Sequence, residues 1–391
     1  VMLPAFAKPK HHAVEARTEK LREWSEASGI NTLEDNHAKI GIITAGVVYQ
    51  YAHEVLGDSV SYLKLGMVNP LPDALLRDFA SRVETVYVIE ELDDIIETHC
   101  KKIGLDVHGK DTFPRCGEFS QAVIAKCLGR GLPQSKAVAE AIPVRPPVMC
   151  CGCPHRGLFY ELKKHKVYVS GDIGCYTLGA SAPLSAMDTC VCMGASVSAL
   201  HGYNKARGPE AEHKSVAVIG DSTFIHSGIT GLIDIAYNRS NSVVIVLDNS
   251  ITGMTGHQQN PTTGYTIKGD PTSAVDLEAL CHAVGIQRVR VCDPYDLKSV
   301  DQALKEELAA DGPSVIISRR PCALLKYVKA KPPLRVDTER CIGCKACMGI
   351  GCPAISMRGG RAVIDQTQCV GCGVCTGLCP KSAICAQEVK E

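Results

Sequence analysis

The stretch that decides the fold is SVAVIGDSTFIHSGITGLIDIAYNRSNSVVIVLDN, residues 215–249. It contains two apolar runs, Ser215–Ile219 and Ser242–Leu247, and a segment of helical character between them, from about residue 228 to 238. Near-continuous apolar runs of this length are typical of parallel strands that are buried on both faces. The stretch therefore predicts a strand, a turn, a helix and a second strand of an open parallel sheet.

Similar apolar runs lie on both sides of this stretch. Val167–Ser170 and Ser314–Ser318 extend the same sheet, and prolines at 143, 146 and 147 mark a linker before it. Upstream, the runs at 39–43, 60–65 and 85–89 alternate with helical segments and predict a first α/β domain. Residues 1–36 are charged and helical in character, and the prolines at 332 and 333 mark a last linker.

The composition is that of an ordinary globular chain. Of 391 residues, 45% are hydrophobic and 21% are charged, and lysine plus arginine equals aspartate plus glutamate, 42 each. Without a net charge, the chain lacks the basic footprint of a protein that binds nucleic acid or anionic lipid. The longest apolar-leaning stretch, 181–200, contains Asp188 and is too polar to span a bilayer. We therefore expect no nucleic-acid partner, no membrane span and a cytoplasmic location.

The chain has 21 cysteines, and they cluster in short C-x-x-C runs instead of forming the even spread of a disulfide framework. The last sixty residues hold an internal repeat, CIGCKACMGIGCPAI at 341–355 and CVGCGVCTGLCPKSAI at 369–384. Each run offers three thiolates in a C-x2-C-x2-C loop and a fourth before a proline, which is the pattern of two ferredoxin-type [4Fe–4S] clusters. Structural zinc is the alternative, but zinc sites use paired C-x2-C knuckles and not triplets.

In two-cluster ferredoxins, the fourth cysteine of each run ligates the cluster of the other run. The predicted ligands of the first cluster are Cys341, Cys344, Cys347 and Cys379. The predicted ligands of the second cluster are Cys369, Cys372, Cys375 and Cys352. The first run is one residue longer than usual between its third and fourth cysteines, which removes no ligand. Residues 331–391 are therefore predicted to form a small α+β domain that transfers electrons.

Polar residues follow both strands of the opening stretch, at the edge where parallel sheets bind ligands. A helix N-terminus after Gly220 offers free amides to a phosphate. Asp221 and Asn249 are hard oxygen ligands suited to Mg²⁺, together with a backbone carbonyl near Ile251. The turn resembles the thiamine diphosphate motif, in which G-D-G/S is followed almost thirty residues later by an asparagine. The cofactor-binding residues that this resemblance implies are Gly220, Asp221, Ser222, Thr223, Asn249, Thr252, Gly253, Met254 and Thr255. A chance βα turn is the alternative.

More cysteines flank the strands of the same domain. MCCGCPHR at 149–156 opens the domain, GDIGCY at 171–176 follows one strand, and a cysteine at 322 follows another. In 2-oxoacid:ferredoxin oxidoreductases, which these motifs resemble, cysteines in similar places hold a cluster next to thiamine diphosphate. The resemblance implies a proximal cluster on Cys150, Cys153, Cys175 and Cys322, and a cofactor pocket that includes His155, Gly171, Asp172 and Gly174. The alternatives are buried, inert thiols and a satisfied core histidine. Residues 193–196 look adjacent to the cofactor, although a buried helix explains them almost as well.

The motifs CxxCPHR, GDIGCYTLG, GDSTFIHSGITGL and LDNSITGMTGHQ and the two ferredoxin runs together resemble one family over essentially the whole chain. It is that of the α subunit of indolepyruvate:ferredoxin oxidoreductase. The resemblance implies a helical arm at 1–36, a transketolase C-terminal-like domain at 37–143, a thiamine diphosphate-binding domain at 144–330 and a ferredoxin domain at 331–391. The expected fold class is thus two doubly wound, mostly parallel α/β domains and a small α+β domain. The expected cofactors are thiamine diphosphate, Mg²⁺, two C-terminal [4Fe–4S] clusters and a third, proximal one.

The family's reaction is the oxidative decarboxylation of an aryl 2-oxoacid with coenzyme A, with electrons passed through iron–sulfur clusters to ferredoxin. The resemblance also implies a β subunit, a hetero-oligomer and an anaerobic source. The sequence does not identify the catalytic acid and base. Three alternatives stay open: a different 2-oxoacid, an electron-transfer module whose thiamine site is structural, and a non-redox thiamine decarboxylase.

One departure from the family concerns the beginning of the chain. The family's α chain is longer and starts with a pyrimidine-binding domain that supplies a glutamate to the aminopyrimidine. This sequence resembles only the C-terminal two-thirds of that chain, so we expect either that it is a fragment or that another polypeptide supplies the remaining part. Glu90 and Glu91 lie at a predicted strand end, but we do not assign either of them that role. The chain is expected to be active only with a partner subunit and the missing domain.

Overall fold

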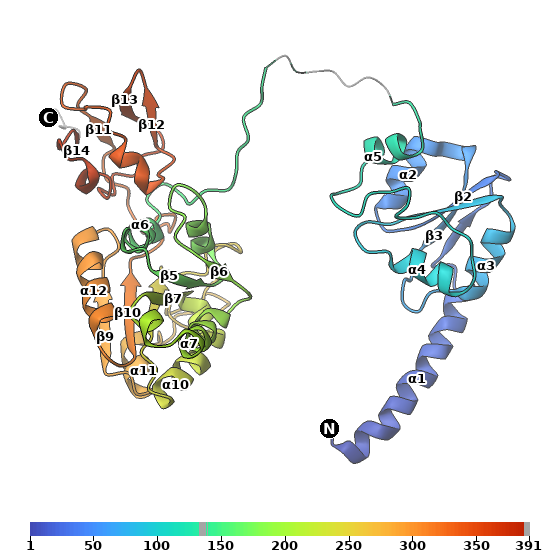
Figure 1. Ribbon diagram of the computed structural model, residues 1–391, viewed down its shortest axis with the longest axis horizontal. Helices are drawn as coiled ribbons and strands as arrows, with labels where there is room; N and C mark the ends of the chain where they lie inside the picture. Colours follow the sequence, from blue (N-terminus) through green and yellow to red (C-terminus); the bar gives the residue numbers. More distant parts are fainter. Residues whose placement is uncertain (133–137, 139, 387–391) are drawn as a thin grey trace. The chain divides into compact units, whose positions relative to one another are not determined.

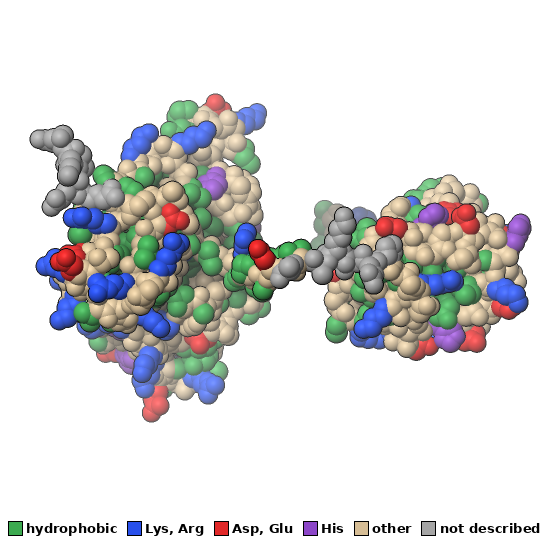
Figure 2. Space-filling model, turned by 90° about the horizontal axis from the view of Figure 1, so that it is seen from above, with side chains coloured by type: hydrophobic (Ala, Val, Ile, Leu, Met, Phe, Trp, Pro, Cys, Tyr) green, Lys and Arg blue, Asp and Glu red, His purple; other side chains and the backbone are tan. Residues whose placement is uncertain are grey.

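The computed structural model describes residues 1–132, 138 and 140–386. The chain forms two compact units, Val1–Ile142 and Pro143–Glu391 (Figure 1). On the face that Figure 2 shows, lysine and arginine side chains are interspersed with acidic and hydrophobic ones, in keeping with the equal numbers of basic and acidic residues. None of the helices in the described ranges combines the length and the hydropathy that a membrane span needs.

The first unit is built on a four-stranded sheet with the strand order β1-β3-β2-β4. β2 runs parallel to β3 and β4, and the short β1 pairs antiparallel with β3. Ile42 and Ile43 of β2 are both fully buried because they point to opposite faces of the sheet and each face is covered. The strands are β1 Thr32–Glu34, β2 Ile40–Ala45, β3 Ser61–Leu65 and β4 Thr85–Ile89. The helices are α1 Pro4–Ala27, α2 Val48–Leu56, α3 Asp73–Ser81, α4 Ile95–Lys102 and α5 Gln121–Cys127.

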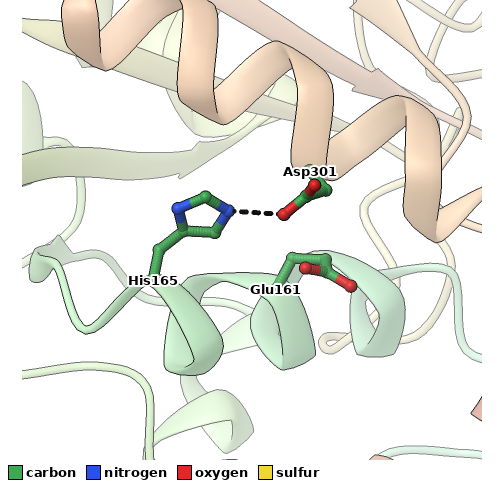
Figure 3. Close-up of side chains that lie close together, drawn as sticks. All are labelled: Glu161, His165 and Asp301. Carbon is green, nitrogen blue, oxygen red and sulfur yellow. Dashed lines mark hydrogen bonds and ion pairs between the residues drawn. The ribbon is translucent and has the colours of Figure 1, made fainter.

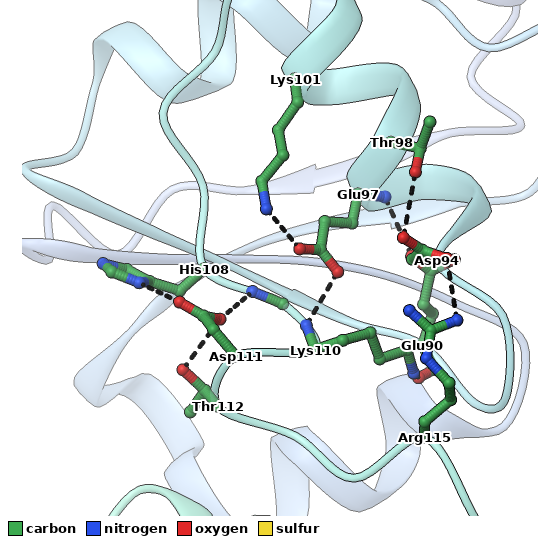
Figure 4. A network of polar contacts seen from close by, with 11 residues as sticks. Glu90, Asp94, Glu97, Thr98, Lys101, His108, Lys110, Asp111, Thr112 and Arg115 are labelled. Atoms are coloured by element: carbon green, nitrogen blue, oxygen red, sulfur yellow. Dashed lines mark hydrogen bonds and ion pairs between the residues drawn. The ribbon is translucent and has the colours of Figure 1, made fainter.

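Glu90 and Glu91 follow β4, and both carboxylates are used within this unit. Glu90 accepts hydrogen bonds from the backbone amides of Ile96 and Glu97, each at 2.9 Å, at the beginning of α4. Figure 4 shows Glu90 and Glu97 in this network. Glu91 Oε1 accepts one from the Phe119 amide at 2.7 Å. Carboxylates at a helix N-terminus and at a free amide stabilise the local backbone. Both carboxylates therefore stabilise the backbone of the first unit.

The second unit contains a six-stranded parallel sheet with the strand order β6-β5-β7-β8-β10-β9. Val216 and Ala217 are adjacent in β7 and lie in two different hydrophobic cores, one on each face. Helices α6 and α12 pack on the first face, and α7, α10 and α11 pack on the second, which makes the sheet doubly wound. The strands are β5 Tyr168–Gly171, β6 Thr189–Cys190, β7 Ser215–Gly220, β8 Val243–Asp248, β9 Arg288–Cys292 and β10 Ser314–Arg319. The helices are α6 His155–His165, α7 Ala195–Arg207, α10 Ile229–Tyr237, α11 Leu277–Ala283 and α12 Leu297–Ala309.

An ion network joins α6 to α12 on the first face (Figure 3). Asp301 accepts hydrogen bonds from His165 Nε2 at 2.9 Å, from Lys164 Nζ at 3.1 Å and from Lys305 Nζ at 2.6 Å. Glu161 accepts one from Lys164 Nζ at 2.8 Å. Side-chain oxygens and nitrogens of Glu161, His165 and Asp301 come close enough for a metal ion, but two lysines already balance the two carboxylates. The network is therefore a helix-packing device.

The last part of the second unit is a small domain of two antiparallel strand pairs. β11 Leu334–Val336 pairs with β14 Ile384–Ala386, and β12 Ile355–Arg358 pairs with β13 Arg361–Ile364. Its core is continuous with the larger sheet domain, because Tyr160 of α6, Tyr295 and Leu297 pack against it. The predicted fold class, two doubly wound α/β sheets and a small cysteine-rich α+β domain, is confirmed.

Candidate active site

A cavity of about 110 Å³ lies at the carboxyl ends of β5, β7 and β8. This is the edge at which parallel sheets bind ligands. It is lined by eleven of the thirteen residues that the sequence predicted to bind a cofactor: His155, Gly174, Gly220, Asp221, Ser222, Thr223, Asn249, Thr252, Gly253, Met254 and Thr255. We call it the cofactor pocket.

Asp221 is the buried acidic group of the cofactor pocket. Its side chain is only 2% exposed and accepts hydrogen bonds from the Ser222 amide at 2.7 Å and from Thr262 Oγ1 at 3.2 Å. Burial and the neighbouring charge of Asp248 raise the pKa of Asp221 to about 7. A buried carboxylate beside a second carboxylate, with no cationic side chain in contact among the described residues, suits a divalent cation. The donor set thus fits Mg²⁺.

Asn249 and Ile251 line the same pocket as Asp221. Both are buried, and they follow β8, which ends one residue before Asn249. The backbone oxygen of Asn249 accepts a hydrogen bond from the Cys322 amide at 2.9 Å, which fixes the segment after β8 against the segment after β10. The three predicted Mg²⁺ ligands therefore come together at one edge of the sheet.

Gly171 and Asp172, predicted for the pocket, do not line it, and the structure gives them other roles. The Asp172 carboxylate is fully buried and accepts hydrogen bonds from the amides of Ile173, Gly194 and Ser196, at 2.8 to 3.2 Å. It thereby fixes the loop before α7 and the beginning of that helix. Gly171 is needed for packing, since a Cβ there would lie 2.3 Å from Met187 Sδ.

Several pocket residues were missed by sequence reasoning. Tyr176 lines the pocket, donates from its hydroxyl to the Ile173 carbonyl at 3.0 Å and packs edge-on against His155, with ring centroids 5.8 Å apart. Its place directly after Gly174-Cys175 was the available signal. Thr262 contacts Asp221 from forty-one residues downstream, and no sequence pattern announced it. The lining residues to which sequence reasoning assigned no role are Ile173, Tyr176 and Leu247, whereas Met193 was expected next to the cofactor.

A second cavity, of about 140 Å³, adjoins the cofactor pocket. Four cysteines from three separate segments line it: Cys150, Cys153, Cys175 and Cys322, which we call the proximal quartet. Burial is the main cause that raises the pKa of Cys153, to about 12, and the nearby Cys150 and Cys175 add to it. Four thiols that converge on one cavity form a donor set suited to an iron–sulfur cluster.

The proximal cavity and the cofactor pocket share part of their walls. His155, Cys175, Asn249 and Gly253 line both. Burial lowers the pKa of His155 to about 4, so its imidazole is neutral near pH 7. Because the two cavities share these lining residues, a group bound in one cavity would be separated from a group in the other by single side chains.

The C-terminal cysteines form two further groups, each drawing on both runs of the repeat. The first quartet, which lines one cavity, comprises Cys341, Cys344, Cys347 and Cys379. The second quartet comprises Cys352, Cys369, Cys372 and Cys375, of which the first three add to the effect of burial in raising the pKa of Cys375 to about 12. Backbone amides also point at sulfur, from Ala383 to Cys379 at 3.2 Å and from Leu334 to Cys369 at 3.4 Å. The structure thus groups the eight cysteines in the same fours as the prediction.

Cys151 stands between the proximal and second quartets. Its sulfur lies 3.8 Å from Gln368 Oε1. Burial and the neighbouring Cys352 raise the pKa of the Cys151 thiol to about 11. Sequence reasoning predicted no role for Cys151.

Comparison with known families defines the class of protein. Residues 172–318 match the family described as "Thiamine pyrophosphate enzyme, C-terminal TPP binding domain", and residues 333–380 match "4Fe-4S dicluster domain". The first match covers β7, β8 and every residue that lines the cofactor pocket except His155, and the second covers both C-terminal quartets. The chain therefore contains a thiamine pyrophosphate-binding domain joined to a dicluster iron–sulfur domain.

Several relatives carry the name indolepyruvate oxidoreductase subunit IorA. The one from Pyrococcus horikoshii is 39% identical over 91% of this chain and 61% of its own length. The one from Archaeoglobus fulgidus is 37% identical over 98% of this chain and 66% of its own. Over the part that it spans, the chain belongs to the indolepyruvate oxidoreductase subunit IorA family. It thus spans 61 to 66% of the length of these relatives.

A solved structure of 2-oxoglutarate:ferredoxin oxidoreductase from Magnetococcus marinus is also similar, at 18% identity and a TM-score of 0.40. The likeness covers 47% of this chain and 67% of that one. A likeness of this strength carries no argument about function.

Proposed function

We propose that the chain takes part in the oxidative decarboxylation of an aryl 2-oxoacid, such as indolepyruvate, with coenzyme A. The balanced reaction is RC(O)COO⁻ + CoA-SH → RC(O)S-CoA + CO₂ + H⁺ + 2e⁻, with ferredoxin as electron acceptor. The observation that carries the proposal is the shared wall of the cofactor pocket and the proximal cavity, lined by His155, Cys175, Asn249 and Gly253. Carbon–carbon cleavage and electron removal must happen close together, and this arrangement suits both.

In this proposal, the cofactor pocket binds thiamine diphosphate and Mg²⁺. The cofactor supplies a carbon nucleophile for the 2-oxo carbon and accepts the electron pair that CO₂ leaves behind. Asp221, Asn249 and the Ile251 carbonyl would hold Mg²⁺, and the turn after Gly220 would offer backbone amides to the diphosphate. His155 and Tyr176 keep water from the buried side of the pocket, since both are buried and pack against each other.

The three quartets hold [4Fe–4S] clusters in this proposal. The proximal quartet holds one beside the cofactor pocket, and the first and second quartets hold two in the small domain. A β subunit, coenzyme A and ferredoxin are the proposed partners, and the chain works in a hetero-oligomer. The family relationship supports these partners, and the activity of the whole enzyme requires the regions of the relatives that this chain does not span.

The test is anaerobic turnover. The chain is purified with its partner polypeptides in the absence of oxygen, and indolepyruvate is added to a viologen dye with and without coenzyme A. Dye reduction that depends on coenzyme A, with pyruvate a much poorer substrate, is the expected result. No reduction by any 2-oxoacid, in a preparation that binds both iron and thiamine diphosphate, would contradict the proposal and favour an electron-transfer module.

A further inference from the structure

The proximal loop, residues 149–153, contacts two cysteine groups from opposite sides. One side carries two cysteines of the proximal quartet. On the other side, Cys151 Sγ lies 3.8 Å from Gln368 Oε1. A Cβ on Gly152 would lie 2.3 Å from Val370 Cγ2, so the loop backbone touches this residue closely. Gln368 and Val370 flank a cysteine of the second quartet, which places the proximal and second quartets on the two sides of one short loop.

Arg156, in the first turn of α6, joins the proximal loop to the small domain. Its Nε donates to the Cys150 carbonyl at 3.1 Å, and its Nη2 donates to the Met149 carbonyl. Its Nη1 donates to the Ile350 carbonyl at 3.2 Å and also to the Gly351 carbonyl. Cys150 belongs to the proximal quartet, and Met149 precedes it. Ile350 and Gly351 are the two residues before Cys352 of the second quartet. One guanidinium therefore holds both backbone segments.

The surroundings of Arg156 indicate that its geometry matters more than its charge. The residue is 5% exposed, and its described hydrogen bonds all go to backbone carbonyls and none to a carboxylate. Burying a charge is costly unless its donors are satisfied, and here the donors are satisfied by two separate segments. The flat fork of arginine reaches several carbonyls at once, whereas the single ammonium of lysine does not.

We propose that Arg156 is a positioning residue that fixes the separation between the proximal quartet and the second quartet, so that electrons enter the small domain at the second quartet. The inference rests on the proposed function, because each quartet must hold a cluster. In each transfer, a cluster at the proximal quartet would lose one electron and be oxidised, and a cluster at the second quartet would gain that electron and be reduced, with no proton or bond moving. The 2-oxoacid supplies the electrons and ferredoxin accepts them. The first quartet is suited to pass electrons on to ferredoxin, since Cys344 is exposed and Ile342, two residues before it, is 61% exposed.

Cluster spacing can be measured without turnover. The full-length chain is purified anaerobically in a Cys379→Ala background, which removes the cluster of the first quartet and leaves two clusters, about eight iron atoms per chain. After reduction with dithionite, magnetic interaction between the two remaining clusters broadens the EPR spectrum. Arg156→Met is expected to keep its iron and to lose this broadening. Arg288→Met is the matched control, because it removes an arginine that pairs with Glu307 within the larger sheet domain, and it is expected to keep the broadening.

Each other outcome decides the matter. Unchanged broadening in Arg156→Met with full iron overturns the inference. The inference is also overturned if the Cys379→Ala chain with Arg156 in place shows no broadening. If Arg156→Met loses iron, Arg156→Lys decides: weaker broadening with full iron supports the inference, and undiminished broadening overturns it. Iron loss in both Arg156 variants, but not in Arg288→Met, assigns Arg156 to cluster retention and overturns it as well. A background chain with only about four iron atoms refutes the proposed proximal cluster, and hence the proposed function.

Discussion

Asp248 ends β8 and Asp221 directly follows the neighbouring parallel strand β7, and Asp248 is paired with an arginine whereas Asp221 is not. Arg319 Nε donates to Asp248 Oδ2 at 2.8 Å. In the part of the chain that the structure describes, Asp221 contacts a backbone amide and a hydroxyl but no basic side chain. The one carboxylate is a structural ion pair, and the other faces the cofactor pocket with its charge uncompensated.

This difference predicts that two similar substitutions, Asp221→Asn and Asp248→Asn, affect the unfolding temperature differently. Asp221→Asn removes a buried, unpaired charge, so the unfolding temperature of the metal-free chain is expected to stay the same or to rise at pH 8. The same change is expected to weaken Mg²⁺-dependent thiamine diphosphate binding by more than about 100-fold, because it removes a ligand and not merely its surroundings. Calorimetric titration measures the affinity, and a thermal melt measures the stability.

Asp248→Asn is the matched control for this prediction. It removes the charged acceptor of Arg319 Nε, while the pair of Arg319 with Glu278 at 2.8 Å remains, and it is expected to lower the unfolding temperature. Thiamine diphosphate binding by Asp221→Asn at the wild-type affinity would contradict the assignment of Asp221 to Mg²⁺.

The grouping of the C-terminal cysteines predicts a pattern among double variants. Cys341→Ala and Cys379→Ala disturb the same quartet, so the double variant is expected to lose about four iron atoms per chain, no more than either single variant. Cys341→Ala with Cys352→Ala disturbs two quartets and is expected to lose about eight. Cys385→Ala, in β14 and outside all three quartets, serves as the control that keeps its iron. Additive loss in the first pair would show that each run holds its own cluster.

A glycine on α6 is expected to be intolerant of a methyl group. A Cβ on Gly157 would lie 1.9 Å from the backbone oxygen of Pro294, which cannot move aside as a flexible side chain can. Gly157→Ala is therefore expected to lower the free energy of unfolding by roughly 3 kcal/mol. The control is Gly202→Ala on α7, where nothing lies within 4 Å and helix propensity predicts a gain of about 0.5 to 1 kcal/mol. Equal effects in chemical denaturation would contradict the close approach.

The network between α6 and α12 predicts a pH dependence. Hydrogen bonds from Lys305, Lys164 and His165 lower the pKa of Asp301 below its ordinary value. A lowered pKa stabilises the fold above the unfolded-state pKa, about 4, and this stabilisation is lost as the pH falls through the folded-state pKa. Asp301→Asn is therefore expected to cost about 1 kcal/mol at pH 7, and the difference from the wild type is expected to shrink below about pH 4.

Unfolding curves at several pH values measure this difference. Asp311→Asn is the control, because the Asp311 side chain is 94% exposed and lies 4.0 Å from His213, too weak a pairing to matter. A cost for Asp301→Asn that does not change with pH would mean that packing, and not charge, explains the effect.

The fold could be predicted well from local patterns. The apolar runs at 215–219 and 242–247 lie in β7 and β8, and the strands at 167–170 and 314–318 overlap β5 and β10. Such runs identify buried parallel strands because a strand that is covered on both faces needs apolar residues at successive positions. Most of the cofactor pocket was predictable for a related reason, since the carboxyl ends of adjacent parallel strands always meet at one edge.

Residues whose role depends on distant partners could not be assigned in this way. Asp172 looked like a pocket residue because it follows a strand, yet its carboxylate turns toward the amides at the beginning of α7. Thr262 belongs to the site through its contact with Asp221, and no spacing rule predicts that contact. Arg156 was part of a quoted motif, but its bond to Ile350 spans 194 residues.

The sequence by itself determined the parallel sheets, the phosphate-binding turn at Gly220-Asp221 and the two ferredoxin-type cysteine runs, because each of these depends on residues that lie close together in the chain. Only the tertiary structure decided that the cofactor pocket and the proximal cavity share a wall and that Arg156 ties the proximal loop to the second quartet. The physical reason is that the direction of a buried side chain depends on which distant backbone or side-chain groups packing brings within hydrogen-bond reach, and spacing along the chain does not encode that.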